Sequence, residues 1–106
     1  MTDLSKVFKK EQVELYNQYP DLFTHDEFVK AWKGYLDMRK LIKKPATLRA
    51  EELGIGQVIR LSKGDVGTAV KIVDQSTFKS WQGLFPLRED LNDEPAGQRT
   101  TLKIGD

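Results

Sequence analysis

The chain has 106 residues, of which 39% are apolar and 31% charged, with 17 Lys plus Arg against 16 Asp plus Glu. This length allows one small domain, and the absence of Cys excludes a disulfide framework, a zinc finger and a thiol nucleophile. A net charge of +1 argues against nucleic-acid binding by bulk charge alone. The chain lacks both a membrane-spanning apolar run and the apolar stretch of a secretory signal, so we expect a soluble cytoplasmic protein.

The first predicted helix covers about residues 5–18, where apolar and aromatic side chains recur on a narrow face. Pro20 should close it, because proline lacks an amide donor and disfavours helical backbone at the preceding residue.

The second predicted helix has a clearer pattern. Thr24 and Glu27 have the spacing of an N-terminal capping box, and apolar residues then recur every three or four positions until Pro45 ends the helix.

The third predicted helix begins at Thr47 or Leu48 and ends at Lys63. Gly54 and Gly56 lie in its middle, where each glycine weakens a helix by roughly 1 kcal/mol relative to Ala. This pair predicts one of three arrangements: a kink, a close contact between helices, or a division into two short helices.

The fourth predicted helix has Asp65 as its N-cap, directly after Gly64 in a left-handed conformation. It should end near Trp81, with Gly83 as its stop. Residues 84–87 are apolar and too few for an independent element, so we expect them to pack back over the helices and close the bundle.

The sequence therefore predicts an all-α fold in residues 1–87, a small bundle of three to four helices with an extended closing segment. Residues 88–106 keep no helical or strand period, and we expect them to form a disordered or loosely attached tail. The domain has a net charge of +3 and the tail one of −2. The near-neutral chain is thus a mildly basic body followed by an acidic tail.

Residues suited to catalysis are scarce. His25 is the only histidine, and its neighbouring carboxylates on a helix point about 100° apart, so they do not converge with it on a metal or substrate. Gly54 and Gly56 resemble part of a dinucleotide-binding loop, but no strand precedes them. Glu51 and Glu52 fit a solvated helix face better than an acid–base pair. We therefore expect a non-enzyme with no catalytic residue, no metal and no cofactor.

The charge distribution is more informative, because residues 30–49 contain seven cations and one carboxylate. Such a stretch suits nucleic-acid phosphates or an acidic partner surface. The alternative is that cations at a helix C-terminus only solubilise it and favour the helix dipole. The candidate contact residues are Lys33, Arg39, Lys40, Lys43 and Lys44.

Aromatic side chains offer a second kind of contact, since single-stranded bases stack on aromatic rings. Trp32 and Tyr35 lie on the apolar stripe of the second helix and are expected in the core. Trp81 and Phe85 flank Gly83 and are the candidate contact residues of the closing motif. Of these two, Trp81 should cover the edge of the core, and Phe85 is the best candidate for an exposed apolar contact.

Residues 28–87 carry the motifs F-x-x-A-W and Y-x-x-x-R-K, then L-S-K-G-D, and finally A-V-K-I-V-D-Q-S followed by W-Q-G-L-F-P-L. They resemble a small helical module of phage, prophage and plasmid DNA-replication proteins, which often follows a winged-helix domain as a C-terminal segment. Such proteins are initiators, replisome organisers or helicase-loader-like factors. Two features depart from that pattern: Thr77 and Phe78 replace a small apolar pair, and no winged-helix domain fits before Phe28.

The resemblance and the basic stretch together imply a non-enzymatic adaptor in phage or mobile-element DNA replication, within the bacterial host cell. It would bind a replicative helicase or another replisome protein, with a weak contact to single-stranded DNA as an additional possibility. A second hypothesis is a small phage-encoded inhibitor that blocks a host protein, such as a defence nuclease or replication factor. A third is a purely structural module that forms homo-oligomers to bury enough surface.

Overall fold

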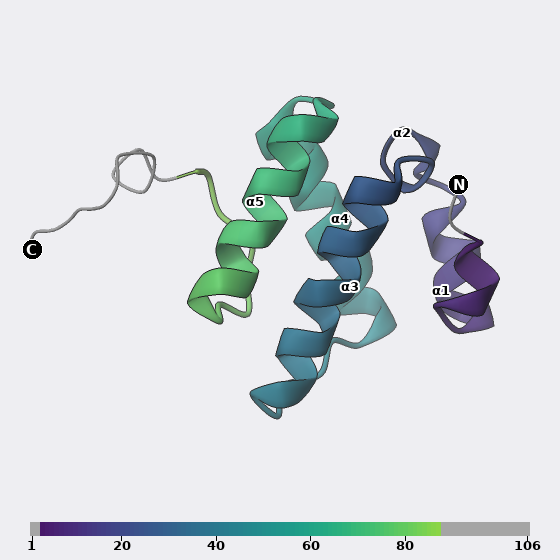
Figure 1. Cartoon of the computed structure of the whole chain (residues 1–106), viewed down its shortest axis with the longest axis horizontal. Helices are drawn as coiled ribbons and strands as arrows, with labels where there is room; N and C mark the ends of the chain where they lie inside the picture. The colour runs from purple at the N-terminus through teal and green to yellow at the C-terminus, as the bar shows by residue number, and fades with distance from the viewer. Residues whose placement is uncertain (1–2, 88–106) are drawn as a thin grey trace, which may run out of the picture.

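The computed structural model describes residues 3–87, and every regular element in this range is helical (Figure 1). A 3-10 turn at Leu4–Lys6 is followed by α1 (Lys10–Tyr16), α2 (Pro20–Phe23), α3 (Asp26–Leu41), α4 (Leu48–Ser62) and α5 (Val66–Lys79). The predicted all-α fold is confirmed, with one short extra helix, α2. The predicted tail, residues 88–106, lies outside the described residues.

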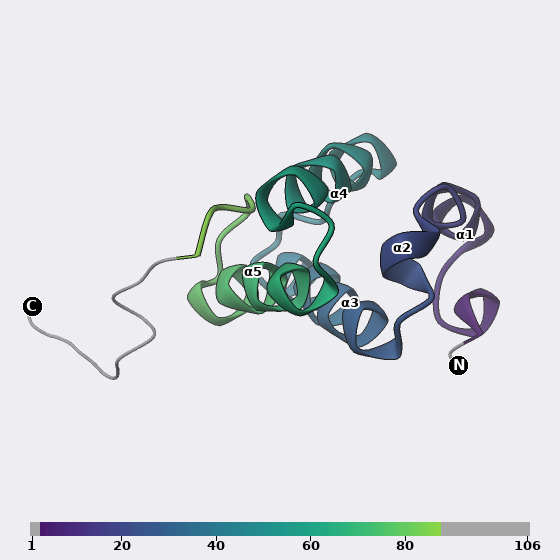
Figure 2. The same cartoon turned by 90° about the horizontal axis from the view of Figure 1, so that it is seen from above.

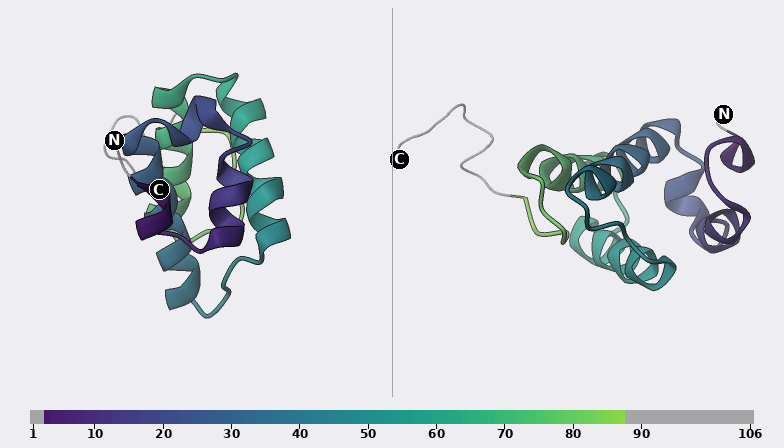
Figure 3. Two further views of the ribbon diagram at one scale, coloured as in Figure 1. Left: turned by 90° about the vertical axis from the view of Figure 1, so that its right-hand side faces the viewer. Right: turned by 90° about the horizontal axis from the view of Figure 1, so that it is seen from below.

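The three long helices form a bundle in which α5 packs against both α3 and α4 (Figure 2). Helices α1 and α2 lie across one side of this bundle, α1 against α4 and α2 against α3 (Figure 3). Aromatic rings fill the junction: Tyr16 and Phe23 stack with centroids 4.2 Å apart, and Phe23 meets the ring of Phe28 edge to face at 5.1 Å. None of the helices within residues 3–87 is long and apolar enough to cross a membrane.

The predicted N-terminal helix is wrong in its bounds, because Pro20 begins a helix instead of ending one. Helix α1 stops at Tyr16, and Pro20 is the first residue of α2, where its missing amide donor is not needed. The predicted capping box of Thr24 and Glu27 is also wrong. The Thr24 hydroxyl donates to the Pro20 carbonyl at 2.6 Å, so it closes α2, and His25 is the N-cap of α3.

The predicted start of α4 and the predicted cap of α5 are confirmed. The hydroxyl oxygen of Thr47 accepts a hydrogen bond from the Ala50 amide at 3.1 Å, and the Asp65 carboxylate accepts one from the Thr68 amide at 2.8 Å. Gly64, between α4 and α5, has a φ of 81°, which is the predicted left-handed conformation. These local signals place the starts of α4 and α5 correctly.

Helix α4 continues through both of its glycines, so the close contact is the predicted alternative that the structure supports. A Cβ atom on Gly54 would lie 3.1 Å from Leu84 Cδ1 and 3.3 Å from Trp32 Cη2. A Cβ atom on Gly56 would meet nothing within 4 Å. Gly54 is therefore the point at which α4 approaches the core tryptophan and the closing segment.

Candidate functional site

The closing segment, residues 81–87, contains no helix or strand, and side chains of the bundle hold it by its main-chain carbonyls. All five carbonyls of residues 82–86 accept hydrogen bonds from α3, α4 and α5. The donors are Tyr35, Arg39, Gln57, Gln75 and Ser76. An irregular segment usually leaves such groups to water, so these bonds fix the path of the chain.

Gln75 and Ser76, the Gln-Ser pair of the sequence motif, are both buried near the end of α5. Ser76 Oγ donates to the Gly83 carbonyl at 2.7 Å, and Gln75 Nε2 donates to the Pro86 carbonyl at 3.1 Å. The Leu84 side chain is buried in the core. The prediction that this motif closes the bundle is confirmed.

The turn into the closing segment differs from the prediction. Helix α5 ends at Lys79, before Trp81, because Ser80 takes a left-handed conformation with φ 58°. Gly83 is not the stop of the helix. It is needed for a close approach, since a Cβ atom there would lie 2.9 Å from Phe85 Cζ. The ring of Phe85 therefore folds back over the glycine.

The closing segment presents aromatic surface. Phe85 is 48% exposed, as predicted, and its ring meets that of the half-buried Trp81 edge to face, with centroids 5.4 Å apart. A shallow groove of about 690 Å³ runs along residues 80–83, Phe85 and Pro86. By contrast, Trp32 and Tyr35 lie in the core, also as predicted.

Arg39 joins the basic end of α3 to the closing segment. Its Nε donates to the Lys44 carbonyl at 2.6 Å, and its Nη1 lies 3.3 Å from the Gln82 carbonyl. The guanidinium also lies over the Tyr35 ring, 5.9 Å from its centroid. Arg39, predicted as a contact residue, is thus engaged within the bundle, and it brings Lys44 close to Gln82.

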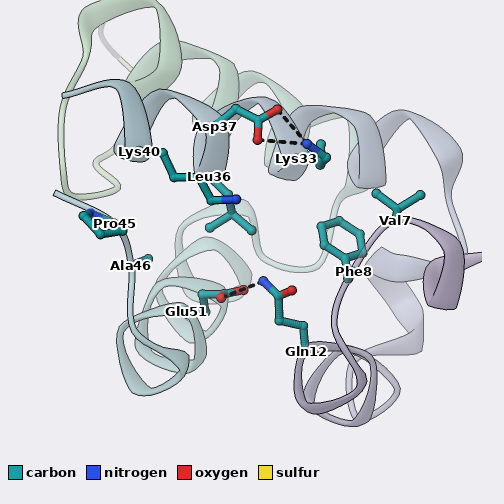
Figure 4. Close-up of a pocket in the computed structure, with 10 residues that line it drawn as sticks. All are labelled: Val7, Phe8, Gln12, Lys33, Leu36, Asp37, Lys40, Pro45, Ala46 and Glu51. Atoms are coloured by element: carbon teal, nitrogen blue, oxygen red, sulfur yellow. Dashed lines mark hydrogen bonds and ion pairs between the residues drawn. The ribbon is translucent and has the colours of Figure 1, made fainter. Parts of the chain in front are cut away.

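The remaining predicted cations lie in two places. Lys33 and Lys40 line a small pocket of about 100 Å³ on the side of α3 that faces α1 and α4 (Figure 4). Lys33 is paired with Asp37 at 2.7 Å. Lys43 and Lys44 are exposed beyond the end of α3, and neither they nor Lys40 forms an ion pair within residues 3–87. Lys33 and Lys40 thus share a pocket, whereas Lys43 and Lys44 follow the last residue of α3.

The family model of the YdaU C-terminal domain matches residues 24–101. The chain belongs to this family. YdaU is a prophage-associated family, which agrees with the expected phage-type module. The YdaU match includes α3, α4, α5 and the closing segment, whereas α1 and α2 precede it. No curated protein and no solved structure matches the chain.

A buried polar cluster joins the YdaU C-terminal domain to the helices that precede it. Glu51, expected on a solvated face, is only 4% exposed, so that expectation is wrong. Its carboxylate accepts a hydrogen bond from the Tyr16 hydroxyl. It accepts another from Gln12 Nε2 at 3.0 Å (Figure 4). Trp32 Nε1 donates to the Tyr16 hydroxyl oxygen at 3.1 Å. Glu51 thus anchors α1 to the YdaU domain.

The spacing within α4 carries a signal for this burial. Glu51 precedes the buried residues Ile55, Val58 and Ser62 at intervals that place all four on one helix face. The charge of the Glu51 side chain favours exposure to solvent, but its position in the helical period favours burial in the core. Within residues 3–87, no three His, Cys, Asp or Glu side chains gather as metal ligands would, and Glu51 is committed to its neutral donors.

The buried phenol of this cluster predicts a loss of stability at alkaline pH. Burial raises the pKa of Tyr16 well above its usual value of about 10, and the hydrogen bond to the Glu51 carboxylate adds to the rise. Above pH ~10 the unfolded tyrosine releases a proton that the folded protein keeps. We therefore expect this group to lower the free energy of unfolding by roughly 1.4 kcal/mol for each pH unit above ~10.

Urea denaturation of the wild type and of Tyr16→Phe, at several pH values on both sides of ~10, measures this contribution. Phenylalanine cannot ionise, so the variant should lose stability with a shallower slope than the wild type. Equal slopes for the two proteins would contradict the assignment.

Proposed function

We propose that this chain is a non-enzymatic protein-binding module of phage or mobile-element DNA replication, and that it binds a replicative helicase or another replisome protein in the cytoplasm of the bacterial host. The prophage association of the YdaU family supports the phage setting. The resemblance of residues 28–87 to modules of replication proteins supports the role in replication. The observation that carries the binding role is the exposed Phe85 on a closing segment held by its carbonyls.

The backbone of the closing segment is preorganised for binding. Aromatic residues are enriched at protein interfaces, and a side chain on a fixed backbone loses less entropy on binding than one on a mobile loop. Gln75 Nε2 donates to the carbonyls of both Phe85 and Pro86, at 3.4 and 3.1 Å, so the backbone beneath the ring is held in place. Phe78 is 81% exposed in the last turn of α5, so it adds apolar surface at the end of the helix that leads into the closing segment.

Direct DNA contact has a smaller part in this proposal. Two of the five predicted cations, Lys33 and Arg39, are engaged within the bundle. Each phosphate contact needs an available cation, and the affinity of nucleic-acid binding rises with the number of such contacts. With Lys40, Lys43 and Lys44 as the unpaired members of that set, protein binding is the primary activity that we propose.

Affinity capture from a bacterial lysate tests the function. The wild-type protein should recover helicase or primosome components, and Phe85→Ala should reduce their recovery roughly tenfold, as expected for an aromatic residue at the centre of an interface. The matched control is Leu53→Ala, which removes an exposed apolar side chain from α4. Recovery of only unrelated proteins, or equal recovery by Phe85→Ala and the wild type, would overturn the proposal.

A further inference from the structure

The closing segment offers hydrogen-bond donors to a ligand and few acceptors. The carbonyls of residues 82–86 all accept bonds from the bundle. The amides of Gln82, Gly83 and Phe85 form no hydrogen bond with any group in residues 3–87. Main-chain amides that lack an internal partner donate to water, and a ligand with acceptor oxygens can replace that water. Carboxylates form the strongest hydrogen bonds of this kind.

The charges around this segment also favour a negative ligand. Arg39 joins the end of α3 to the closing segment, because its guanidinium contacts the carbonyls of Lys44 and Gln82. Residues 39–44, which lead to this junction, contain four cations and no carboxylate. Lys43 and Lys44 are exposed and lack ion pairs within residues 3–87, so their charge is available to a ligand at the Gln82 end of the segment.

The aromatic groups decide between two kinds of acidic ligand. Bases of single-stranded DNA need exposed ring faces on which to stack. The rings of Trp81 and Phe85 are nearly perpendicular, at 87°, so the edge of one ring covers a face of the other and reduces the surface on which bases can stack. The two rings form an apolar notch within the groove of residues 80–83, Phe85 and Pro86, and this notch fits an aliphatic or aromatic side chain better than a run of stacked bases.

We infer that the closing segment binds an acidic peptide in which carboxylates stand next to an apolar side chain. The amides of Gln82, Gly83 and Phe85 bind its carboxylate and carbonyl oxygens, and the Trp81–Phe85 notch takes its apolar side chain. Lys43 and Lys44 supply complementary charge. This inference rests on the proposed protein-binding function and specifies the chemistry of the partner.

The first experiment uses the full chain labelled with ¹⁵N and a synthetic peptide of Glu, Asp and Phe. On titration, the amide resonances of Gln82, Gly83 and Phe85 should shift in a saturable way, and the amide of Leu53 on α4 should stay in place. Tryptophan fluorescence gives a second readout, because Trp32 is fully buried and Trp81 is half-exposed. A peptide with Lys in place of the acidic residues should cause neither change.

Charge-reversal variants test the specificity. Lys43→Glu combined with Lys44→Glu should weaken the acidic peptide roughly tenfold or more, because it both removes attraction and adds repulsion. Arg60→Glu, at an exposed cation on α4, should leave affinity unchanged. Equal binding of the Lys-containing peptide, or stronger shifts of the same amides with oligo(dT), would overturn the acidic-peptide inference.

The two proposals fail in different ways. Replication proteins captured through Phe85, with recovery unaffected by the Lys43→Glu and Lys44→Glu changes, would keep the binding function and overturn the acidic partner. Saturable shifts of the closing-segment amides by the acidic peptide, with no replication protein captured from lysate, would support the inferred chemistry and overturn the role in replication.

Discussion

Replacing Glu51 with alanine should lower the free energy of unfolding by roughly 3 kcal/mol. The change removes the acceptor of the buried Tyr16 hydroxyl and one acceptor of the partly buried Gln12 Nε2, and a buried donor left without a partner costs about 1–3 kcal/mol. Chemical denaturation near neutral pH measures the difference. Glu51→Gln keeps one oxygen as an acceptor and should recover about half of the loss.

The matched control for Glu51 is the next residue. Glu52 pairs with Arg49 at 2.8 Å, and both side chains are well exposed. Because exposed ion pairs contribute little, Glu52→Ala should change the stability by less than about 1 kcal/mol. A Glu52→Ala protein as unstable as Glu51→Ala would show that the buried cluster is not what holds α1 to α4.

The two glycines of α4 should respond in opposite directions. Gly54→Val should cost roughly 2–3 kcal/mol, because the new Cβ would lie 3.1 Å from Leu84 and 3.3 Å from the ring of Trp32, and its branches add further crowding. Gly56→Ala should stabilise the protein by about 0.5–1 kcal/mol, since its Cβ meets open space and alanine favours helix.

Thermal or urea denaturation of both glycine variants tests this pair. Destabilisation by Gly56→Ala would contradict the open space beside that residue. A Gly54→Val protein as stable as the wild type would contradict the close approach of α4 to the closing segment. Far-UV circular dichroism should show unchanged helix content for Gly56→Ala.

Local chemistry explains which helix bounds could be predicted. Thr47 and Asp65 cap their helices through their own side chains, so three or four residues of sequence contain the whole interaction. The role of Pro20 could not be predicted from local sequence. Proline either ends one helix or begins the next, and the choice depends on whether Leu22 and Phe23 find a core to enter, as they do against α3.

The candidate site was predicted only in part, for a similar reason. The closing motif and the exposure of Phe85 follow from the order of residues near Gly83. The hydrogen bonds of Arg39 could not be predicted in this way, because its partners at Lys44 and Gln82 come together only through the packing of α3 against α5. The burial of Glu51 depends likewise on α1, whose donors Gln12 and Tyr16 lie far from it in sequence.

The Glu51 cluster also affects which truncated forms of this domain we expect to fold. The family match begins at residue 24, yet the ring of Phe23 packs against Phe28 and Trp32 inside the match. Tyr16 accepts a hydrogen bond from Trp32, and Gln12 donates one to Glu51. A shorter chain that starts at residue 24 would remove the Phe23 ring from Trp32 and the Tyr16 and Gln12 donors from the Glu51 carboxylate. We therefore expect the folding unit to extend beyond the boundary of sequence similarity and to include α1 and α2.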